Sequence, residues 1–403
     1  MRRMAVAGLV SLLMLVQVAT AASLSDLLGP TADLLGPLNK VTAPFEFELQ
    51  RTISRGTDFP ATATTPGFTY KLNPELGVYE RSSVSLGSAF LDRADTVGKG
   101  RFDLGISYLH ADFTEKDGDS LDGFQDVVLY SRFGGTGGFL DAAQVDFLKF
   151  DLSTDALYFS STYGILPNLD VNLLVPLFIT SLDVRQRLTT KLTGSQLTAE
   201  RSDDAVGPGD VQIRLKYLLG EWSNVKGALG LAFRAPTGSE EDFQGIGDPT
   251  VTPSFVMSGS LGRLDLHGNL GFEFNADDME RSRFAYGIGT SYGVFDRLTI
   301  NVDVIGTSQV TDDEVSETVA FPAAEVREIN VNNIGRRFEV TPLGSHSSEV
   351  STTLDRLDVV DIAVGLKFNL FGKVVAFASA IVPLTSDGVR ADVIPAGGIE
   401  ATF

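Results

Sequence analysis

The chain has 403 residues, no cysteine and a formal charge of −20, from 32 basic and 52 acidic side chains. Without cysteine it makes no disulfide and has neither a thiolate metal site nor a thiol nucleophile. Its acidity argues against nucleic acid as a partner, because phosphate binding needs clustered lysine and arginine. Abundant glycine (41) and phenylalanine (27) suit an all-β chain with many turns.

The first 22 residues have the three parts of a secretory signal peptide. Arg2 and Arg3 precede an apolar run from Met4 to Val16, and small residues follow at 19–22. The run is shorter than the roughly 20 apolar residues of a spanning helix. We therefore predict export, with cleavage after Ala21 or Ala22. Loss of the two arginines takes the charge from −20 to −20 − 2 = −22.

Residues 23–98 form a second region with a pattern of its own. Two similar turns, 24–30 and 32–37, each contain Asp-Leu-Leu-Gly-Pro, and a stretch rich in Thr, Ala and Pro follows at 57–66. We read the repeated motif as two short helical turns, with a partner-docking motif as the alternative. The region as a whole is predicted to be a plug inside a barrel, a periplasmic extension or a disordered arm.

From Arg101 to the end, apolar and polar residues alternate along successive stretches, which is the pattern of half-buried β-strands. The region 99–403 is therefore predicted to be a single β domain. Twelve strands are expected, beginning at 101 and lying near 143–164, 169–179, 211–217, 223–236, 249–260, 264–275, 284–292, 298–304, 356–370, 372–384 and 389–403.

The connections between these strands alternate in length. Tight turns lie at 166–168, 220–222, 261–263, 293–296 and 371–372, and longer stretches lie at 115–140, 186–207, 237–248, 275–282, 311–350 and 385–389. Outer-membrane barrels alternate short periplasmic turns with longer extracellular loops. We predict an all-β, antiparallel up-and-down transmembrane barrel of about 12 strands (about 10–14), located in the bacterial outer membrane. A soluble β-sandwich explains the alternation of residues but not this rhythm of connections.

The last strand ends on an aromatic residue, Phe403, with no polar tail behind it. We expect it to close the barrel against the strand that begins near Arg101. Glu400 and Thr402 should then point inward, while Ile399 and Phe403 face lipid. The lipid bilayer is one expected partner, and the barrel assembly machinery is another, through this strand.

Three motifs suggest chemistry, but each is better explained without it. Gly289 to Gly293 matches the nucleophile elbow G-x-S-x-G, yet it lies within a strand rather than on a strand–helix turn. His267, with Asp265, Asn269 and Glu273 on the same face, has the geometry of a metal site but only one histidine. The acidic stretch Asp312, Asp313, Glu314 and Glu317 could attract Ca²⁺, but we read it as a solvated loop. We expect no cofactor, no metal and no catalytic residue.

The predicted inward faces mix both signs of charge. Such a lumen could pass polar solutes, or the charges could be internal ion pairs. The candidate lumen-lining residues are Arg214, Lys216, Asp265, His267, Glu273, Asp361, Lys367 and Glu400.

Three stretches resemble a known family: Leu91 to Tyr108 with its Gly-Lys-Gly turn, Tyr163 to Val171, and Phe233-Arg-Ala-Pro-Thr-Gly238 followed by 245–258. They are similar to the outer-membrane transporter family named for meta-pathway phenol degradation, itself similar to fatty-acid and aromatic-hydrocarbon channels. The resemblance covers about 90–403 and implies passive uptake of small, hydrophobic molecules. It offers no catalytic residues, and in the related channels an N-terminal segment plugs the lumen.

The function predicted from these observations is an outer-membrane channel for passive uptake of a small, hydrophobic or aromatic solute. The alternative is a barrel without a transport role that serves as a structural anchor or binds partners with its surface loops. A hydrolase is disfavoured because the sequence offers no clear base–nucleophile pair.

Overall fold

The structure is a computed structural model that describes residues 23–28, 40–42, 70–73, 78–81, 85–134, 137–190, 196–330 and 336–403. The predicted signal peptide and the Thr/Pro-rich stretch at 57–66 lie outside the described residues. Within the described residues, no helix is long and apolar enough to cross a membrane.

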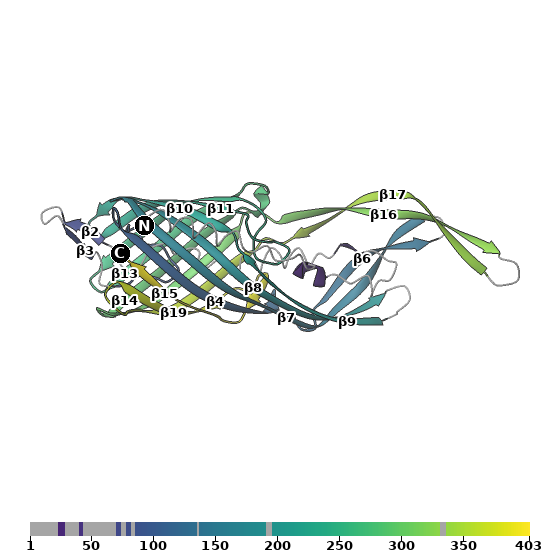
Figure 1. Cartoon of the computed structure of the whole chain (residues 1–403), viewed down its shortest axis with the longest axis horizontal. Coiled ribbons are helices and arrows are strands. Elements are labelled where there is room, and N and C mark those ends of the chain that lie inside the picture. The colour runs from purple at the N-terminus through teal and green to yellow at the C-terminus, as the bar shows by residue number, and fades with distance from the viewer. Residues whose placement is uncertain are drawn as a thin grey trace, which may run out of the picture.

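A closed antiparallel barrel of twelve strands forms the body of the protein (Figure 1). Each strand pairs with the next along the chain, which is the up-and-down order predicted from the sequence. The strands are β4 (Phe102–Lys116), β7 (Gly137–Leu166), β8 (Leu169–Thr190), β10 (Val211–Trp222), β11 (Val225–Ala235), β12 (Thr250–Leu261), β13 (Leu264–Asn275), β14 (Arg283–Phe295), β15 (Leu298–Gln309), β18 (Asp358–Asn369), β19 (Val374–Pro383) and a last strand built from β20 (Val389–Ala391) and β21 (Ile394–Thr402).

The barrel closes where the last strand meets the first. β21 pairs with β4, with Ile399 opposite Ile106. Phe403 completes the seam, because its N–H donates to the carbonyl of Phe102 at 2.7 Å and its carbonyl accepts from the N–H of Phe102 at 3.1 Å. Thr402 is 1% exposed, whereas Phe403 is 60% exposed. The predicted partner strand and the predicted directions of these side chains are confirmed.

One detail of the last strand differs from the prediction. A single strand over 389–403 placed Ala391 and Val393 on one face, but the strand breaks at Asp392 and Val393, between β20 and β21. Ala391 is buried inside the barrel, while Val393 is 49% exposed. The break is a local irregularity that shifts the alternation by one residue, which a strict period of two does not detect.

Three stretches predicted as loops are largely β-structure beyond the barrel, so this prediction is wrong. The stretch at 115–140 contains β5 (Asp119–Ser120) and β6 (Gln125–Gly134), and 186–207 is taken up by the end of β8 and by β9 (Gln196–Pro208). The stretch at 311–350 is a long hairpin of β16 (Asp313–Asn330) and β17 (Arg336–Leu354), which projects far from the barrel (Figure 1). Hairpins outside the membrane satisfy their backbone hydrogen bonds without one buried face, so they need no alternating pattern.

The remaining described elements are short. They are a 3₁₀ turn η1 (Leu24–Leu27), a second turn η3 (Met279–Arg281), and the strands β1 (Lys40–Thr42), β2 (Tyr70–Asn73) and β3 (Val78–Arg81). η1 confirms the first of the two predicted helical turns. Its repeat at 32–37 lies outside the described residues.

The outer surface of the barrel is apolar. Leu104, Ile106 and Tyr108 on β4 are all more than 40% exposed, and so are Leu229 and Leu231 on β11. A soluble protein does not leave so many large apolar side chains in water over contiguous strands. A hydrocarbon bilayer accommodates them, and closed barrels leave no unpaired edge there. The protein is therefore a bacterial outer-membrane barrel, and its tight turns mark the periplasmic end.

The two faces of β11 provide a test of this orientation. Arginine at Leu231, which faces lipid, should destabilise the barrel by about 2–4 kcal/mol if the residue lies near the midplane. Glutamate at the adjacent Ala232, which faces the lumen directly opposite Arg214, should cost much less because the two side chains have opposite charges. Urea unfolding measures the loss of stability of each variant. Folded and unfolded barrel are distinguished on a gel by the different migration of unboiled and boiled samples. Equal losses for the two variants, or migration unchanged by boiling, would contradict the assigned orientation.

Candidate functional site in the barrel lumen

A row of small residues hollows the inside of the barrel wall. Gly230 of β11 lies opposite Ser254 of β12, which lies opposite Gly271 of β13, and the row continues through Ala285 of β14 to Thr307 of β15. Because these five neighbouring strands carry little side-chain volume at one level, space remains between them and the far wall. The result is a cavity of about 200 Å³.

Charged residues line the cavity on the side nearer the extracellular end. Arg283 of β14 binds both carboxylate oxygens of Glu273 of β13, with Nε–Oε1 at 3.0 Å and Nη2–Oε2 at 3.2 Å. Arg390 of β20 pairs with the fully buried Asp361 of β18. Bidentate and charge-assisted contacts of this kind fix the side chains in place. Both carboxylates of these pairs are therefore already engaged by guanidinium groups.

The wall made by β10 and β11 is cationic. Arg214 and Lys216 of β10 and Arg234 of β11 all line the cavity. Arg214 is held by a neutral amide, since its Nε and Nη2 donate to Oε1 of Gln212 at 3.2 and 2.7 Å. Lys216 donates to the carbonyl of Arg93 at 3.1 Å. Three cations therefore project from two adjacent strands into one side of the cavity.

The other half of the lumen is apolar towards its extracellular end, whereas Asp103, Asp170 and Asn172 make it polar near the periplasm. The predicted mixture of charges on the inward faces does not extend to this apolar part. Its buried side chains come from the contiguous strands β19–β21, β4, β7 and β8, and pack with Leu24, Leu28, Phe90 and Leu91. In these strands, the inward positions of the middle and of the extracellular end carry large apolar residues. They include Leu109, Phe113, Leu152, Tyr158, Leu174, Phe178, Ile381 and Ile394. Towards its extracellular end, the lumen is thus apolar on one side and charged on the other.

Residues 85–98 enter the lumen from the periplasmic end and form the floor of the cavity. The Oγ of Ser85 donates to Oγ of Ser291 at 2.8 Å, and the N–H of Val97 donates to Asp170 at 2.9 Å. Between these contacts, the N–H of Ala94 donates to Oγ of Ser258 at 3.0 Å. Polar side chains of the barrel thus bind the backbone of this segment, which satisfies donors that burial would otherwise leave costly.

Two glycines of β14 make room for the top of this segment. A Cβ atom at Gly287 would collide with Leu91, and one at Gly289 would lie 2.8 Å from its Cδ1. Leu91 is 3% exposed and lines the cavity from below. Gly289, the first glycine of the pattern that resembled a nucleophile elbow, is therefore explained by the close approach of Asp303 and Leu91.

Ser291, the central residue of that motif, does meet a histidine. Its Oγ lies 3.0 Å from Nε2 of the buried His267. Within the described residues, however, Nδ1 of His267 has no hydrogen-bond partner, so the pair lacks the carboxylate that orients the base of a catalytic triad. Ser291 also accepts from Ser85, so the three side chains form a link between the floor segment and the barrel.

The eight candidate lumen residues all lie on inward faces but do not form one site. Arg214, Lys216, Glu273 and Asp361 line the cavity. Asp265 and His267 are buried below it, each about 3% exposed. Lys367 and Glu400 pair at 3.6 Å near the periplasmic end. Sequence analysis missed Arg234, Arg283 and Arg390 in the cavity, although the alternation of β11 and β14 already placed the first two inward.

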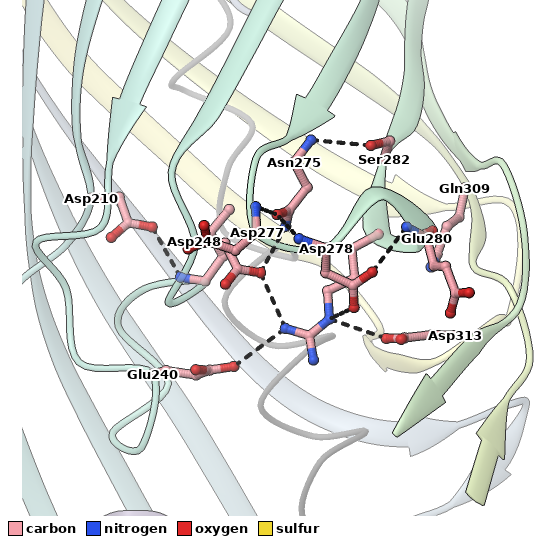
Figure 2. Close-up of polar contacts among 12 residues, drawn as sticks. Asp210, Glu240, Asp248, Asn275, Asp277, Asp278, Glu280, Ser282, Gln309 and Asp313 are labelled. Carbon is pink, nitrogen blue, oxygen red and sulfur yellow. Dashed lines mark hydrogen bonds and ion pairs between the residues drawn. The ribbon is translucent and has the colours of Figure 1, made fainter. Parts of the chain in front are cut away.

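At the extracellular rim, Arg281 of η3 is surrounded by carboxylates. Figure 2 labels these carboxylates, which are Glu240, Asp248, Asp278 and Asp313. Its Nη1 lies 3.2 Å from Asp248, and its Nε lies 3.2 Å from Asp313 and 3.3 Å from Asp278. Burial alone would lower the pKa of this guanidinium, but Asp313, Asp248 and the other carboxylates raise it above its usual value. The nearby Glu240 carboxyl has a raised pKa because burial outweighs the attraction of Arg281.

The same cluster contains the described residues best placed for a metal ion. Carboxylate oxygens of Asp278, Glu280 and Asp313 lie within 4.8 Å of one another. Two of these carboxylates, however, already contact the guanidinium of Arg281. A bound cation would compete with that arginine, so the cluster is better understood as an ion-pair network that holds η3 against the start of β16.

Comparison with known proteins identifies the family of the chain. The family described as "Putative MetA-pathway of phenol degradation" matches residues 132–335, which is 204 of the 403 residues. The chain belongs to this family. The phenol-degradation family match runs from within β6 to the residue before β17, and so includes the cationic wall and the row of small residues. No curated protein matches the chain.

Several solved structures are similar to the chain at low sequence identity. An outer membrane channel from Pseudomonas putida F1 is 13% identical, with a TM-score of 0.46, and the match covers 76% of this chain and 97% of that one. A FadL homologue from Pseudomonas aeruginosa is 11% identical, with 86% and 97% covered and a TM-score of 0.36. The toluene transporter TodX of P. putida is 10% identical, with 75% and 88% covered and a TM-score of 0.31.

Proposed function

We propose that the protein is an outer-membrane channel for passive uptake of a small, hydrophobic or aromatic solute. The observation that carries this proposal is the cavity of about 200 Å³ inside the closed barrel, whose lining combines charged side chains with apolar ones such as Leu91, Ile305 and Val389. A dry apolar cavity of about 150 Å³ is large enough to bind benzene. A single aromatic ring with one polar substituent therefore fits, and the phenol-degradation family description points to the same class of solute.

We further propose that the N-terminal region, residues 23–98, includes the plug of this channel. Its described part at 85–98 lies across the lumen below the cavity and is buried almost throughout. Lys226 binds Asp95 at 2.5 Å, and Oγ of Ser88 donates to Asp303 at 2.6 Å. A solute that leaves the cavity towards the periplasm must pass or displace this segment.

Filling the cavity should block transport. Tryptophan at Ala232, which lines the cavity, should reduce solute flux by at least about tenfold, since the bulky ring occupies most of the space. Tryptophan at Leu231, the next residue and on the lipid face, should leave flux unchanged. Liposome swelling in a panel of small solutes, with conductance in planar bilayers, measures both. No flux through the wild-type protein for any solute would rule out the channel.

Locking the segment to the barrel tests the plug. The Oγ atoms of Ser85 and Ser291 lie 2.8 Å apart, and the chain has no other cysteine to interfere, so Ser85→Cys with Ser291→Cys should form a disulfide. Oxidation should abolish flux if the segment must move, and a reductant should restore it. The single variant Ser291→Cys should respond to neither treatment. Full flux through the oxidised double variant would make 85–98 a fixed part of the wall.

A barrel that binds partners without transport is the second candidate. The long β16–β17 hairpin and the extended ends of β7, β8 and β9 favour it, because they reach far beyond the membrane (Figure 1). The flux measurements separate the two functions, since a surface-binding barrel has no reason to lose activity on filling of the cavity.

We also propose that the barrel assembly machinery recognises the last strand. Phe403 is its final residue and forms the seam with Phe102. Deletion of Phe403 removes two seam hydrogen bonds and an exposed ring, so it should lower the amount of folded barrel in the outer membrane. Heat-modifiable protein in membrane fractions measures this, with Phe371→Ala, an exposed aromatic at a periplasmic turn, as the control. Unchanged assembly after the deletion would contradict the proposal.

A further inference from the structure

Three consecutive hairpin turns at the periplasmic end of the barrel share a short sequence pattern. In each turn, a large apolar residue is followed two positions later by a basic one. The pattern is Leu-Gly-Arg at 261–263 after β12, Phe-Asp-Arg at 295–297 after β14, and Phe-Gly-Lys at 371–373 after β18. The two turns that precede these around the rim have asparagine at the basic position, as Leu-Pro-Asn at 166–168 and Trp-Ser-Asn at 222–224. The basic position is therefore confined to one side of the rim.

Backbone hydrogen bonds join the three turns into a continuous arc. The N–H of Gly293, near the end of β14, donates to the carbonyl of Arg263 at 2.9 Å. In the same way, Asn369 at the end of β18 donates to the carbonyl of Arg297 at 2.8 Å, and the last strand donates to that of Lys373 at 3.0 Å. Because successive hairpins are two strands apart, their turns are separated by about 10 Å. Three basic residues thus follow one stretch of the periplasmic rim.

The apolar residue of each turn lies at the edge of the lipid-facing surface. Leu261 is 62% exposed, Phe295 54% and Phe371 82%. Leu261 also continues the row of exposed apolar residues on β12 that includes Phe255 and Met257. Aromatic residues typically mark the membrane interfaces of outer-membrane barrels. The basic residue beside each apolar one therefore lies at the level of the headgroups in the periplasmic leaflet.

The arc is basic although the protein as a whole is acidic. Its turns at 261–264, 295–298 and 370–374 contain three basic residues and one acidic residue, Asp296, whereas the whole chain has 32 basic and 52 acidic residues. Asp296 lies 3.8 Å from Arg263, whose Nη1 also donates to two backbone carbonyls. Within the described residues, Arg297 and Lys373 have no ion-pair partner, and both are exposed. These two side chains are therefore available to an anion from the membrane.

We propose that this arc, formed by the turns of Arg263, Arg297 and Lys373, binds anionic phospholipids of the periplasmic leaflet. The lipid phosphate lies at Arg297 and Lys373, and the acyl chains lie against Phe295 and Phe371. Basic residues close to a lipid surface attract anionic headgroups. A choline headgroup has the same phosphate but adds a cation that the arc repels, so phosphatidylglycerol should bind more tightly than phosphatidylcholine.

The test titrates the purified protein in detergent with dioleoyl phosphatidylglycerol or dioleoyl phosphatidylcholine, and native mass spectrometry counts the bound lipids. The wild-type protein should bind its first phosphatidylglycerol about tenfold more tightly than phosphatidylcholine. Arg297→Gln with Lys373→Gln should lose most of this preference, whereas Arg297→Lys with Lys373→Arg conserves both charges and should keep it. Arg185→Gln with Arg356→Gln removes the same charge from exposed extracellular positions, and it should leave the preference unchanged.

Equal affinity of the wild-type protein for the two lipids would overturn the inference, as would an equal loss in the extracellular control pair. Glycerophosphate, which has the phosphate but no acyl chain, should bind far more weakly than phosphatidylglycerol. Equally tight binding of glycerophosphate would make the arc a site for soluble phosphates and not for lipid. Gel migration of unboiled samples shows which variants are folded. If the glutamine pair does not fold, Arg297→Gln and Lys373→Gln alone give the same comparison, each with a smaller loss.

Discussion

The closing seam between β21 and β4 is the interaction on which the rest of the structure depends. Inside a bilayer there is no water to satisfy an exposed strand edge, and each unpaired backbone group costs several kcal/mol. The pairing from Ala396 opposite Leu109 to Thr402 opposite Asp103, continued by Phe403, removes that edge. Only a closed wall can have an inside, so the apolar half, the cationic wall and the floor segment all presuppose this seam.

Small inward residues shape the lumen as much as large or charged ones do. Gly230, Gly271 and Ala285 leave a hollow, while Gly287 and Gly289 admit Leu91 just below it. Because both features depend on small residues at matching registers of neighbouring strands, they are properties of the sheet rather than of any one strand. The charged residues then project over the hollow from the next inward positions.

The barrel was predictable from the sequence because a strand with lipid on one face and a lumen on the other must alternate. The pairing of the last strand followed from closure of an even-numbered barrel, and alternation along their own strands assigned Arg214 and Glu273 inward. The cavity was not predictable, since it depends on cross-strand register. The hairpin of β16 and β17 was also missed, because its two strands form a sheet of their own outside the barrel wall.

The floor segment was beyond sequence analysis for a different reason. Residues 85–98 have no repeating pattern, since their backbone is bound by individual side chains such as Ser258 and Asp170 that lie far away in the sequence. A periodic pattern of apolar and polar residues indicates a regular strand or helix, and this segment forms neither. The apolar half of the lumen was not predicted either. Alternation gives the direction of Leu109 and Phe178, but it does not show that an inward face is apolar.

The amino-terminal turn of the described chain has a consequence for topology. The N–H of Leu24 donates to Asp242 and that of Ser25 to the carbonyl of Glu241, both in the extracellular loop between β11 and β12. Phe403 lies at the opposite end of the barrel, among the periplasmic turns. Leu24 and Phe403 therefore lie at opposite ends of the barrel. An epitope inserted beside Ser23 should be reached from the cell-surface side, and one inserted at the turn around Gly372 from the periplasm.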